Sequence, residues 1–268
     1  MKQILIFGAG WLGMHIAESL CASGRKVIVA TRDASFRKSL PNLTFLEVSF
    51  STADGAIRFN GGHPENIDEI LVMLPPSNML NYEHTITSIC SIFPAVGHFV
   101  FTSSTGVYAH NQGVVNESFP IKENHPVVRA EKCIKKHFPR RHSIIRLSGL
   151  VGCDRHPVSY LLRKERHLNG LAPVNLIHRL DILVALQVLL DSSSEDYGVY
   201  NLCYPKHLNR KEYYCEMARA LFKKSLYFET QGDGKTIDGS KFANTFNYSY
   251  QYDIGDATNF SKVGTNNM

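Results

Sequence analysis

Short apolar runs alternate with helix-like segments through the first half of the chain. The runs cover residues 3–8, 26–31, 43–48, 69–74, 98–104 and 143–149. Stretches with helical spacing of apolar residues lie between them, at 13–23, 79–93 and 126–138. Strands that are apolar almost throughout need cover on both faces. The alternation therefore predicts an α/β fold with a doubly wound, parallel sheet.

The alternation of apolar runs and helix-like segments becomes less regular after Gly149. The patterns predict helices over 157–170, 180–192 and 209–224 and a strand over 198–203. We expect a core over residues 1–150 and a small C-terminal lobe over 151–268, which packs on the core and returns part of its chain to the sheet. The stretch from Gly255 is polar and weakly patterned, so its end is expected to fray.

Composition limits the function less than the fold. The 268 residues are 44% hydrophobic, enough for one large domain or two small ones. The net charge of +5 is mild, and it indicates tolerance of anionic ligands rather than a nucleic-acid surface. The basic run 132–142 fits an exposed helix face, so nucleic-acid binding is kept only as a third hypothesis. No apolar run approaches the roughly 18 residues of a membrane span.

Six cysteines are scattered along the chain without a C-x-x-C pair. This spacing is typical of free thiols in a reducing compartment rather than of a disulfide framework or a zinc site. The sequence therefore predicts structural cysteines, no metal site and a cytoplasmic location.

The first apolar run leads into a glycine loop. Gly8, Gly10 and Gly13 form G-x-G-x-x-G between a predicted strand and a predicted helix. The first glycine permits a tight turn, the second lets the backbone approach a pyrophosphate, and the third lets helix and strand pack closely. With Trp11 and Leu12 they would place the pyrophosphate at the helix N-terminus, as in a Rossmann-type dinucleotide site. The alternative is a merely structural turn.

The end of the second strand bears on which dinucleotide is bound. Thr31 and Arg32 stand where an NAD-preferring protein usually carries an acid, and Arg37 and Lys38 follow a turn later. A guanidinium can hold the 2′-phosphate of NADP with two hydrogen bonds. NADP is therefore favoured over NAD, although Asp33 is close enough to keep NAD as an alternative.

The segment FVFTSSTGVYAH at 99–110, together with the glycine loop, resembles the extended short-chain dehydrogenase/reductases, the NAD(P)-dependent epimerase/dehydratase superfamily. The segments at 144–157, 174–186 and 198–221 resemble later parts of the same family. Phe7, where another glycine is usual, and TFNYSYQY at 245–252 look most like its atypical YeeZ-like branch. Members of that branch keep the fold and often lack the full active site.

The resemblance implies a set of site residues. Ser104 corresponds to the hydroxyl that holds the substrate oxygen, and Leu74, Pro75 and Ser103 would face the cofactor. The family's Tyr-x-x-x-Lys pair, in which the lysine lowers the phenol pKa, should follow about two dozen residues later. That window, ENHPVVRAEKCI at 123–134, has no tyrosine. Lys132 is left as a remnant of the pair. The resemblance also implies pairing into a homodimer.

Other polar residues have structural explanations that are stronger than catalytic ones. The literal Y-x-x-x-K at Tyr160 to Lys164 lies too far from Ser104 and is attributed to chance. His178 and Asp181 are expected to close the site and cap a helix. Surface or packing roles are expected for a further group: Tyr108, His110, Glu117, Glu123, His125 and Arg129.

Two functions remain open from the sequence. One is an NAD(P)-dependent oxidoreductase or epimerase that acts on a carbonyl or sugar-type small molecule, with Ser104 and Lys132 at the reacting centre. The other is an NADP-binding sensor or scaffold that lost catalysis with the tyrosine. Fold alone cannot separate them, because function depends on the site.

Overall fold

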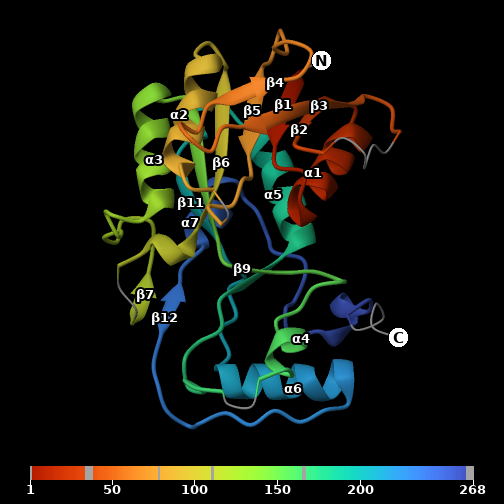
Figure 1. Cartoon of the computed structure of the whole chain (residues 1–268). Coiled ribbons are helices and arrows are strands. Elements are labelled where there is room, and N and C mark those ends of the chain that lie inside the picture. The colour runs from red at the N-terminus through yellow and green to blue at the C-terminus, as the bar shows by residue number, and fades with distance from the viewer. Residues whose placement is uncertain (1, 34–38, 78, 110–111, 165–166, 264–268) are drawn as a thin grey trace. The chain divides into compact units, whose positions relative to one another are not determined.

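The computed structural model describes residues 2–33, 39–77, 79–109, 112–164 and 167–263. Its main feature is an eight-stranded sheet with the strand order β11-β8-β6-β5-β1-β2-β3-β4 (Figure 1). The strands are β1 (Gln3–Phe7), β2 (Lys26–Thr31), β3 (Leu43–Phe50), β4 (Ile57–Phe59), β5 (Glu69–Val72), β6 (His98–Ser104), β8 (His142–Leu147) and β11 (Val199–Leu202).

The centre of this sheet is parallel. Strand β1 pairs in parallel with β2 and β5, β2 with β3, and β5 with β6. Only β4 is antiparallel among these pairings, beside β3 at one edge. The sheet is therefore the mostly parallel, doubly wound sheet that the alternating pattern predicts.

Helices connect the parallel strands. Helix α1 (Trp11–Ala22) follows β1 and packs on β1, β2 and β3, whereas α2 (Tyr82–Ile92) and α3 (Pro126–His137) pack on each other. Figure 1 shows α2 and α3 on one side of the sheet and α1 on the other. Because both faces are covered, the central strands are apolar: all residues from Ile4 to Phe7 are fully buried.

The chain divides into two compact units. Unit 1 comprises Met1–Val107, Lys122–Ile145 and Leu189–Val199, and unit 2 comprises Tyr108–Ile121, Arg146–Val188 and Tyr200–Met268. The division passes through β8, α5 (Arg179–Asp191) and β11.

Unit 2 has small sheets of its own. Strand β7 (Gly113–Val115) pairs with β12 (Lys235–Ile237), and β9 (Gly149–Val151) pairs with β10 (Leu176–His178), both in parallel. Its helices are α4 (Val158–Leu161), α6 (Arg210–Phe222) and α7 (Ser240–Thr245). A core of aliphatic and aromatic side chains forms around Tyr213 and Met217 of α6.

One expectation for the second half is wrong. The helix predicted over 157–170 is only the short α4, because the chain then turns and His167 bridges to Phe228. The polar stretch after Gly255 still contributes apolar anchors, since Phe260 is fully buried and Val263 is 7% exposed. Residues 264–268 lie outside the described part of the chain, and so does the expected frayed end.

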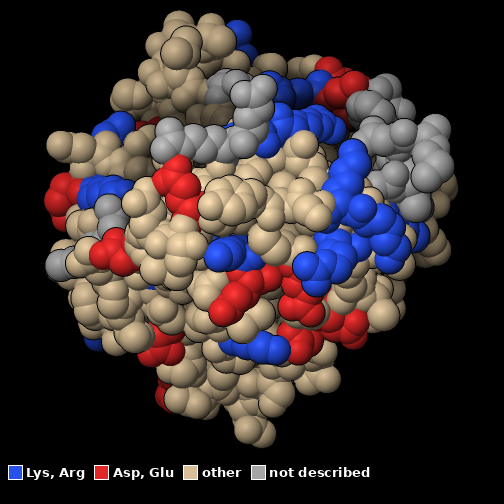
Figure 2. Space-filling view, turned by 90° about the horizontal axis from the view of Figure 1, so that it is seen from below, with Lys and Arg blue, Asp and Glu red and all other residues tan. Residues whose placement is uncertain are grey.

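The surface carries both signs of charge. In Figure 2, lysine and arginine side chains are interspersed with aspartate and glutamate over much of the visible face, and a basic group lies towards one side. Within the described residues, none of the helices combines the length and hydropathy needed to cross a bilayer.

Candidate functional site: a glycine cradle and the end of β6

The glycine loop between β1 and α1 is packed too tightly for side chains at two of its three glycines. Gly8 has φ +115°, and a Cβ atom there would lie 2.8 Å from the carbonyl oxygen of Met73. A Cβ atom on Gly13 would lie 1.8 Å from the carbonyl oxygen of Gly8. These two glycines let strand, turn and helix come together.

Gly10 differs from them because the space above it is open. A Cβ atom there would meet no heavy atom within 4 Å. Gly10 is the N-cap of α1 and offers no side-chain cap, and the first helical hydrogen bond runs from the Met14 amide to the Gly10 carbonyl oxygen. The earlier amides of this helix end have no helical partner and lie beside open space, as a bound pyrophosphate requires.

This open space belongs to a pocket of about 660 Å³ in unit 1. A second pocket of about 260 Å³ adjoins it and shares Arg32, Phe50, Leu74 and Pro75 with it. Trp11 also lines the larger pocket, whereas Leu12 is buried in α1 and contributes its backbone to the helix end. The volume of the larger pocket is in the range of small-molecule and cofactor sites.

The turn after β5 forms one wall of both pockets. Leu74 and Pro75 line them, and the Tyr82 hydroxyl donates a hydrogen bond of 2.9 Å to the Leu74 carbonyl oxygen. Tyr82 is 3% exposed, and burial raises the pKa of its phenol. The neutral hydroxyl therefore acts as a fixed donor that holds the turn in place.

The end of β2 forms another wall of the larger pocket. The Thr31 hydroxyl donates to the Asp33 carbonyl oxygen at 3.0 Å and accepts from the Asp33 amide at 3.3 Å, which shapes the turn. Arg32 is exposed, lines both pockets, and has no hydrogen bond or ion pair with another described residue. Arg37 and Lys38, expected a turn later, lie outside the described residues.

The pocket residues that the sequence reasoning missed include Met14 and His15 on α1, and Phe45 and Phe50 on β3. His15 donates from Nδ1 to the Trp11 carbonyl oxygen at 2.8 Å, one helical turn back. Their signal was available but weak, because it depends on which side of α1 and of the third strand faces the loop.

The end of β6 carries two adjacent serines with different environments. Ser103 is 6% exposed, and its hydroxyl donates to the fully buried Glu131 carboxylate at 2.6 Å. Ser104 is exposed, and its Oγ atom accepts a hydrogen bond of 3.0 Å from the Gly106 amide. The Ser103 hydroxyl is therefore committed to the protein, whereas the Ser104 hydroxyl keeps a proton to donate.

Lys132 lies on helix α3. Within the described residues, no hydrogen bond joins its side chain to Ser104. Lys132 is exposed and forms an ion pair with Glu123, which precedes the helix. Its neighbour Glu131 points inward to Ser103 instead, since successive helical residues are turned about 100° from each other. The sequence reasoning missed Glu131, whose signal was an acid on the apolar face of α3.

The other polar residues near this helix have structural partners. The His125 side chain caps α3 by accepting the Val127 amide proton at 3.2 Å. Arg129 pairs with Glu83 of α2 at 2.7 Å. The Tyr160 ring is contacted by the Lys164 ammonium at 4.6 Å, and Tyr160 is 61% exposed. His110 lies outside the described residues.

Polar residues of unit 2 hold its own backbone and side chains. The buried Tyr108 hydroxyl donates to Asn201 at 2.6 Å and accepts from Arg146 at 3.1 Å. The backbone amide of Asn201 donates to the Glu117 carboxylate at 2.7 Å. These contacts are packing roles, as expected for Tyr108 and Glu117.

Asp181 lies in the first turn of α5 and holds the segment around residue 250. It accepts hydrogen bonds from the Tyr248 hydroxyl and the Gln251 amide, both at 2.8 Å. Burial raises the pKa of this carboxyl, and the hydrogen bonds oppose the rise. His178 stacks on Tyr252 with ring centroids 4.8 Å apart, and burial lowers its pKa.

Comparison with known proteins decides the family. The chain is 31% identical to the protein YeeZ of Escherichia coli strain K12 over 280 aligned positions, which cover 94% of this chain and 97% of the relative. This chain belongs to the YeeZ family. No family model matches it.

Solved structures support the same fold from a greater distance. The protein MoeE5, solved with UDP-glucuronic acid and NAD, has a TM-score of 0.75 at 18% identity and covers 97% of this chain and 98% of its own. UDP-glucuronic acid 4-epimerase from Bacillus cereus, solved with NAD, also has a TM-score of 0.75, at 14% identity with 97% of each chain covered. The YeeZ-family chain therefore has the fold of extended short-chain dehydrogenase/reductases.

Proposed function

We propose that this chain binds a nicotinamide dinucleotide in the pocket of unit 1 and acts as an NAD(P)-dependent oxidoreductase or epimerase on a carbonyl or sugar-type small molecule. The observation that carries the proposal is the open space above Gly10 at the N-terminus of α1, within a pocket of about 660 Å³. A Cβ atom at Gly10 would project into this cradle, at the place where a pyrophosphate would approach the backbone.

Different residues of the pocket would bind different parts of the dinucleotide. The amides of the α1 terminus would hold the pyrophosphate, and Arg32 would hold a 2′-phosphate, so we propose a preference for NADP over NAD. Leu74 and Pro75 would flank the nicotinamide half, where the Tyr82 hydrogen bond fixes their turn. When bound, the dinucleotide supplies the hydride donor or acceptor. Both structural relatives named above were solved with NAD, and MoeE5 also with UDP-glucuronic acid, which supports the substrate class.

Ser104 is the residue that we propose for the substrate. The Gly106 amide donates to its Oγ atom, so the serine proton points elsewhere and can bond a substrate oxygen. A hydroxyl that accepts one hydrogen bond donates a stronger one. Ser104 would thereby hold and polarise a carbonyl or alcohol oxygen, but it is too weak a base to remove a proton alone.

One observation favours a second candidate, an NADP-binding sensor or scaffold without turnover. Lys132 is tied to Glu123, Glu131 is tied to Ser103, and the window 123–134 contains no tyrosine. The partner that should complete proton transfer beside Ser104 is therefore missing from its usual place.

A fluorescence titration with NADPH and NADH, followed by a turnover screen, separates the candidates. We expect saturable binding with a preference for NADPH. Consumption of bound NADPH with aldehydes, ketones or nucleotide sugars, abolished in Ser104→Ala, would establish the enzyme. Tight binding without consumption across the panel would establish the sensor, and no binding of either nucleotide would reject both.

A further inference from the structure

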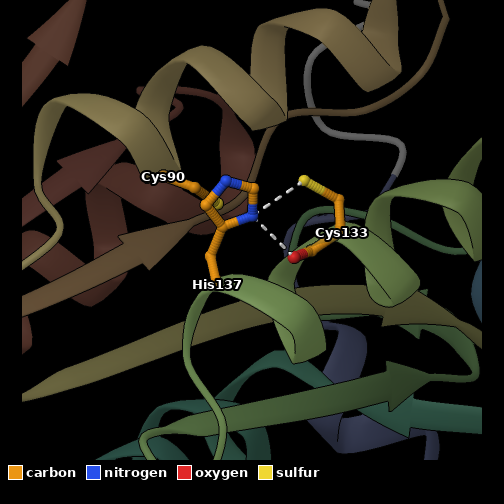
Figure 3. A group of neighbouring side chains, drawn as sticks. All are labelled: Cys90, Cys133 and His137. Carbon is orange, nitrogen blue, oxygen red and sulfur yellow. Dashed lines mark hydrogen bonds between the residues drawn. The ribbon is translucent and has the colours of Figure 1, made fainter.

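Three potential metal ligands meet between helices α2 and α3 of unit 1, away from the glycine cradle. Cys90 comes from α2, and Cys133 and His137 come from α3 (Figure 3). Their ligand atoms all lie within 4.8 Å of one another. We propose that these three side chains form a binding site for a thiophilic divalent ion of the Zn²⁺ class.

The distances suit tetrahedral coordination. Zinc lies about 2.3 Å from thiolate sulfur and about 2.0 Å from imidazole nitrogen, which places neighbouring ligand atoms about 3.5 Å apart for a sulfur and a nitrogen. The Cys133 Sγ atom and the His137 Nδ1 atom are 3.5 Å apart. One edge of the coordination tetrahedron is therefore already present, and the Cys90 Sγ atom lies within 4.8 Å of both of the other ligand atoms.

The backbone makes this arrangement rigid. Cys133 and His137 are separated by one helical turn, so their side chains share a face of α3, as paired ligands on a helix do in zinc sites. Cys90 is fully buried on the facing side of α2. The His137 Nδ1 atom now donates to the Cys133 carbonyl oxygen at 2.9 Å, and the ion would replace that contact.

The charges of the ligands suit a divalent ion. Cysteine binds zinc as a thiolate, so binding releases the thiol protons to solvent. Two thiolates, from Cys90 and Cys133, then cancel the two positive charges of the ion, which suits a centre that includes the fully buried Cys90.

The residues around the proposed metal site leave it accessible to solvent and provide an outer hydrogen-bond partner. Cys133 is half-buried, and the Thr87 hydroxyl lies 3.1 Å from its sulfur as an outer partner. The fourth position would be taken by water from the solvent side of His137, as in zinc sites with three protein ligands. The pairing was hidden in the sequence, because Cys90 lies on a different helix from the Cys133-x-x-x-His137 spacing.

Cobalt titration of the reduced, chelator-treated full chain tests the site. We expect one Co²⁺ per chain, with a thiolate-to-cobalt charge-transfer band and the strong visible bands of tetrahedral cobalt, and we expect Zn²⁺ to displace it. Cys133→Ser and His137→Gln should each weaken Co²⁺ binding by at least about tenfold. Cys90→Ser is a third variant of the site. Because Cys90 is fully buried, this variant could fail to fold, and His137→Gln then still tests the site.

The control variants replace a cysteine and a histidine that lie outside the proposed metal site. Cys215→Ser changes another half-buried helical thiol, and His84→Gln changes an exposed histidine of α2; both should bind Co²⁺ like the parent chain. The proposal is overturned if cobalt bands are absent, or if they survive Cys133→Ser unchanged. The proposal is also overturned if the isolated chain contains a Cys90–Cys133 disulfide and takes up no metal after reduction. The two cysteines would then be a redox pair.

Discussion

The glycine cradle and the β6–α3 region both belong to unit 1, yet they differ in what they retain. Around the cradle, Gly8 and Gly13 are packed against backbone, and Gly10 leaves room for a ligand. At the end of β6, Ser104 keeps an available hydroxyl, but Lys132 is tied to Glu123. Binding and chemistry therefore depend on separable parts of this fold.

The difference has a physical origin. The cradle depends on backbone positions, where an added Cβ atom would collide with the backbone or project into the pocket, so its geometry follows from the absence of side chains. Proton transfer depends on two or three side chains in mutual reach, and a single substitution removes it without disturbing the fold.

The largest effect is expected for Gly13→Ala. Its Cβ atom would lie 1.8 Å from the Gly8 carbonyl oxygen, so helix α1 must shift away from β1. We expect a loss of about 3 kcal/mol in the free energy of unfolding, at the upper end for overpacking. Urea denaturation measures it, and an unchanged midpoint would show that the turn is less tightly packed than the structure indicates.

The two serines of β6 should respond differently. Ser103→Ala leaves the fully buried Glu131 carboxylate without one of its donors, and it should lower the free energy of unfolding by about 2 kcal/mol. Ser104→Ala changes an exposed side chain and should alter stability by less than about 0.5 kcal/mol. Equal effects in thermal unfolding would remove the distinction between a structural and a substrate-facing serine.

A cofactor-selective effect is expected for Arg32→Ala. Loss of a charge-assisted hydrogen bond to the 2′-phosphate should weaken NADPH binding by about tenfold and leave NADH binding unchanged. Arg58 of β4, an exposed arginine that lines neither pocket, provides the control variant Arg58→Ala. Parallel fluorescence titrations decide the point, and an unaltered NADPH/NADH ratio in Arg32→Ala would refute the assigned preference.

The smallest effect is expected for Lys132→Ala. Its ion pair with Glu123 is exposed at both ends, so stability should change by no more than about 0.5 kcal/mol. Dinucleotide binding and any turnover should also be unchanged. A variant that binds NADPH normally but loses turnover would restore Lys132 as a catalytic residue.

The sequence was sufficient for the parts of the fold that rest on local pattern. Strands β2 and β6 lie at the residues that the apolar runs indicated, and α3 begins at Pro126, where the predicted helix begins. The glycine spacing identified the cradle because each glycine has a separate backbone reason to be there. The helix predicted over 157–170 failed, because contacts such as the bridge from His167 to Phe228 override local periodicity.

The side-chain pairs could not be obtained in the same way. Glu131 meets Ser103, and Cys90 meets Cys133, only after α3 folds back against the sheet and against α2. Likewise, Phe45 and Phe50 line the pocket because β3 lies beside β2, a pairing that the apolar runs do not specify. Long-range register, rather than residue type, decides these contacts.

Calorimetric titration of NADPH into the parent chain and into Gly10→Ala tests the central claim most directly. The new methyl group would project into open space, so the folded state should lose no more than about 1 kcal/mol. The parent should bind one NADPH per chain, and the folded variant should bind it at least about tenfold more weakly. Equal affinities, or no heat from the parent chain, would show that this loop does not hold a dinucleotide.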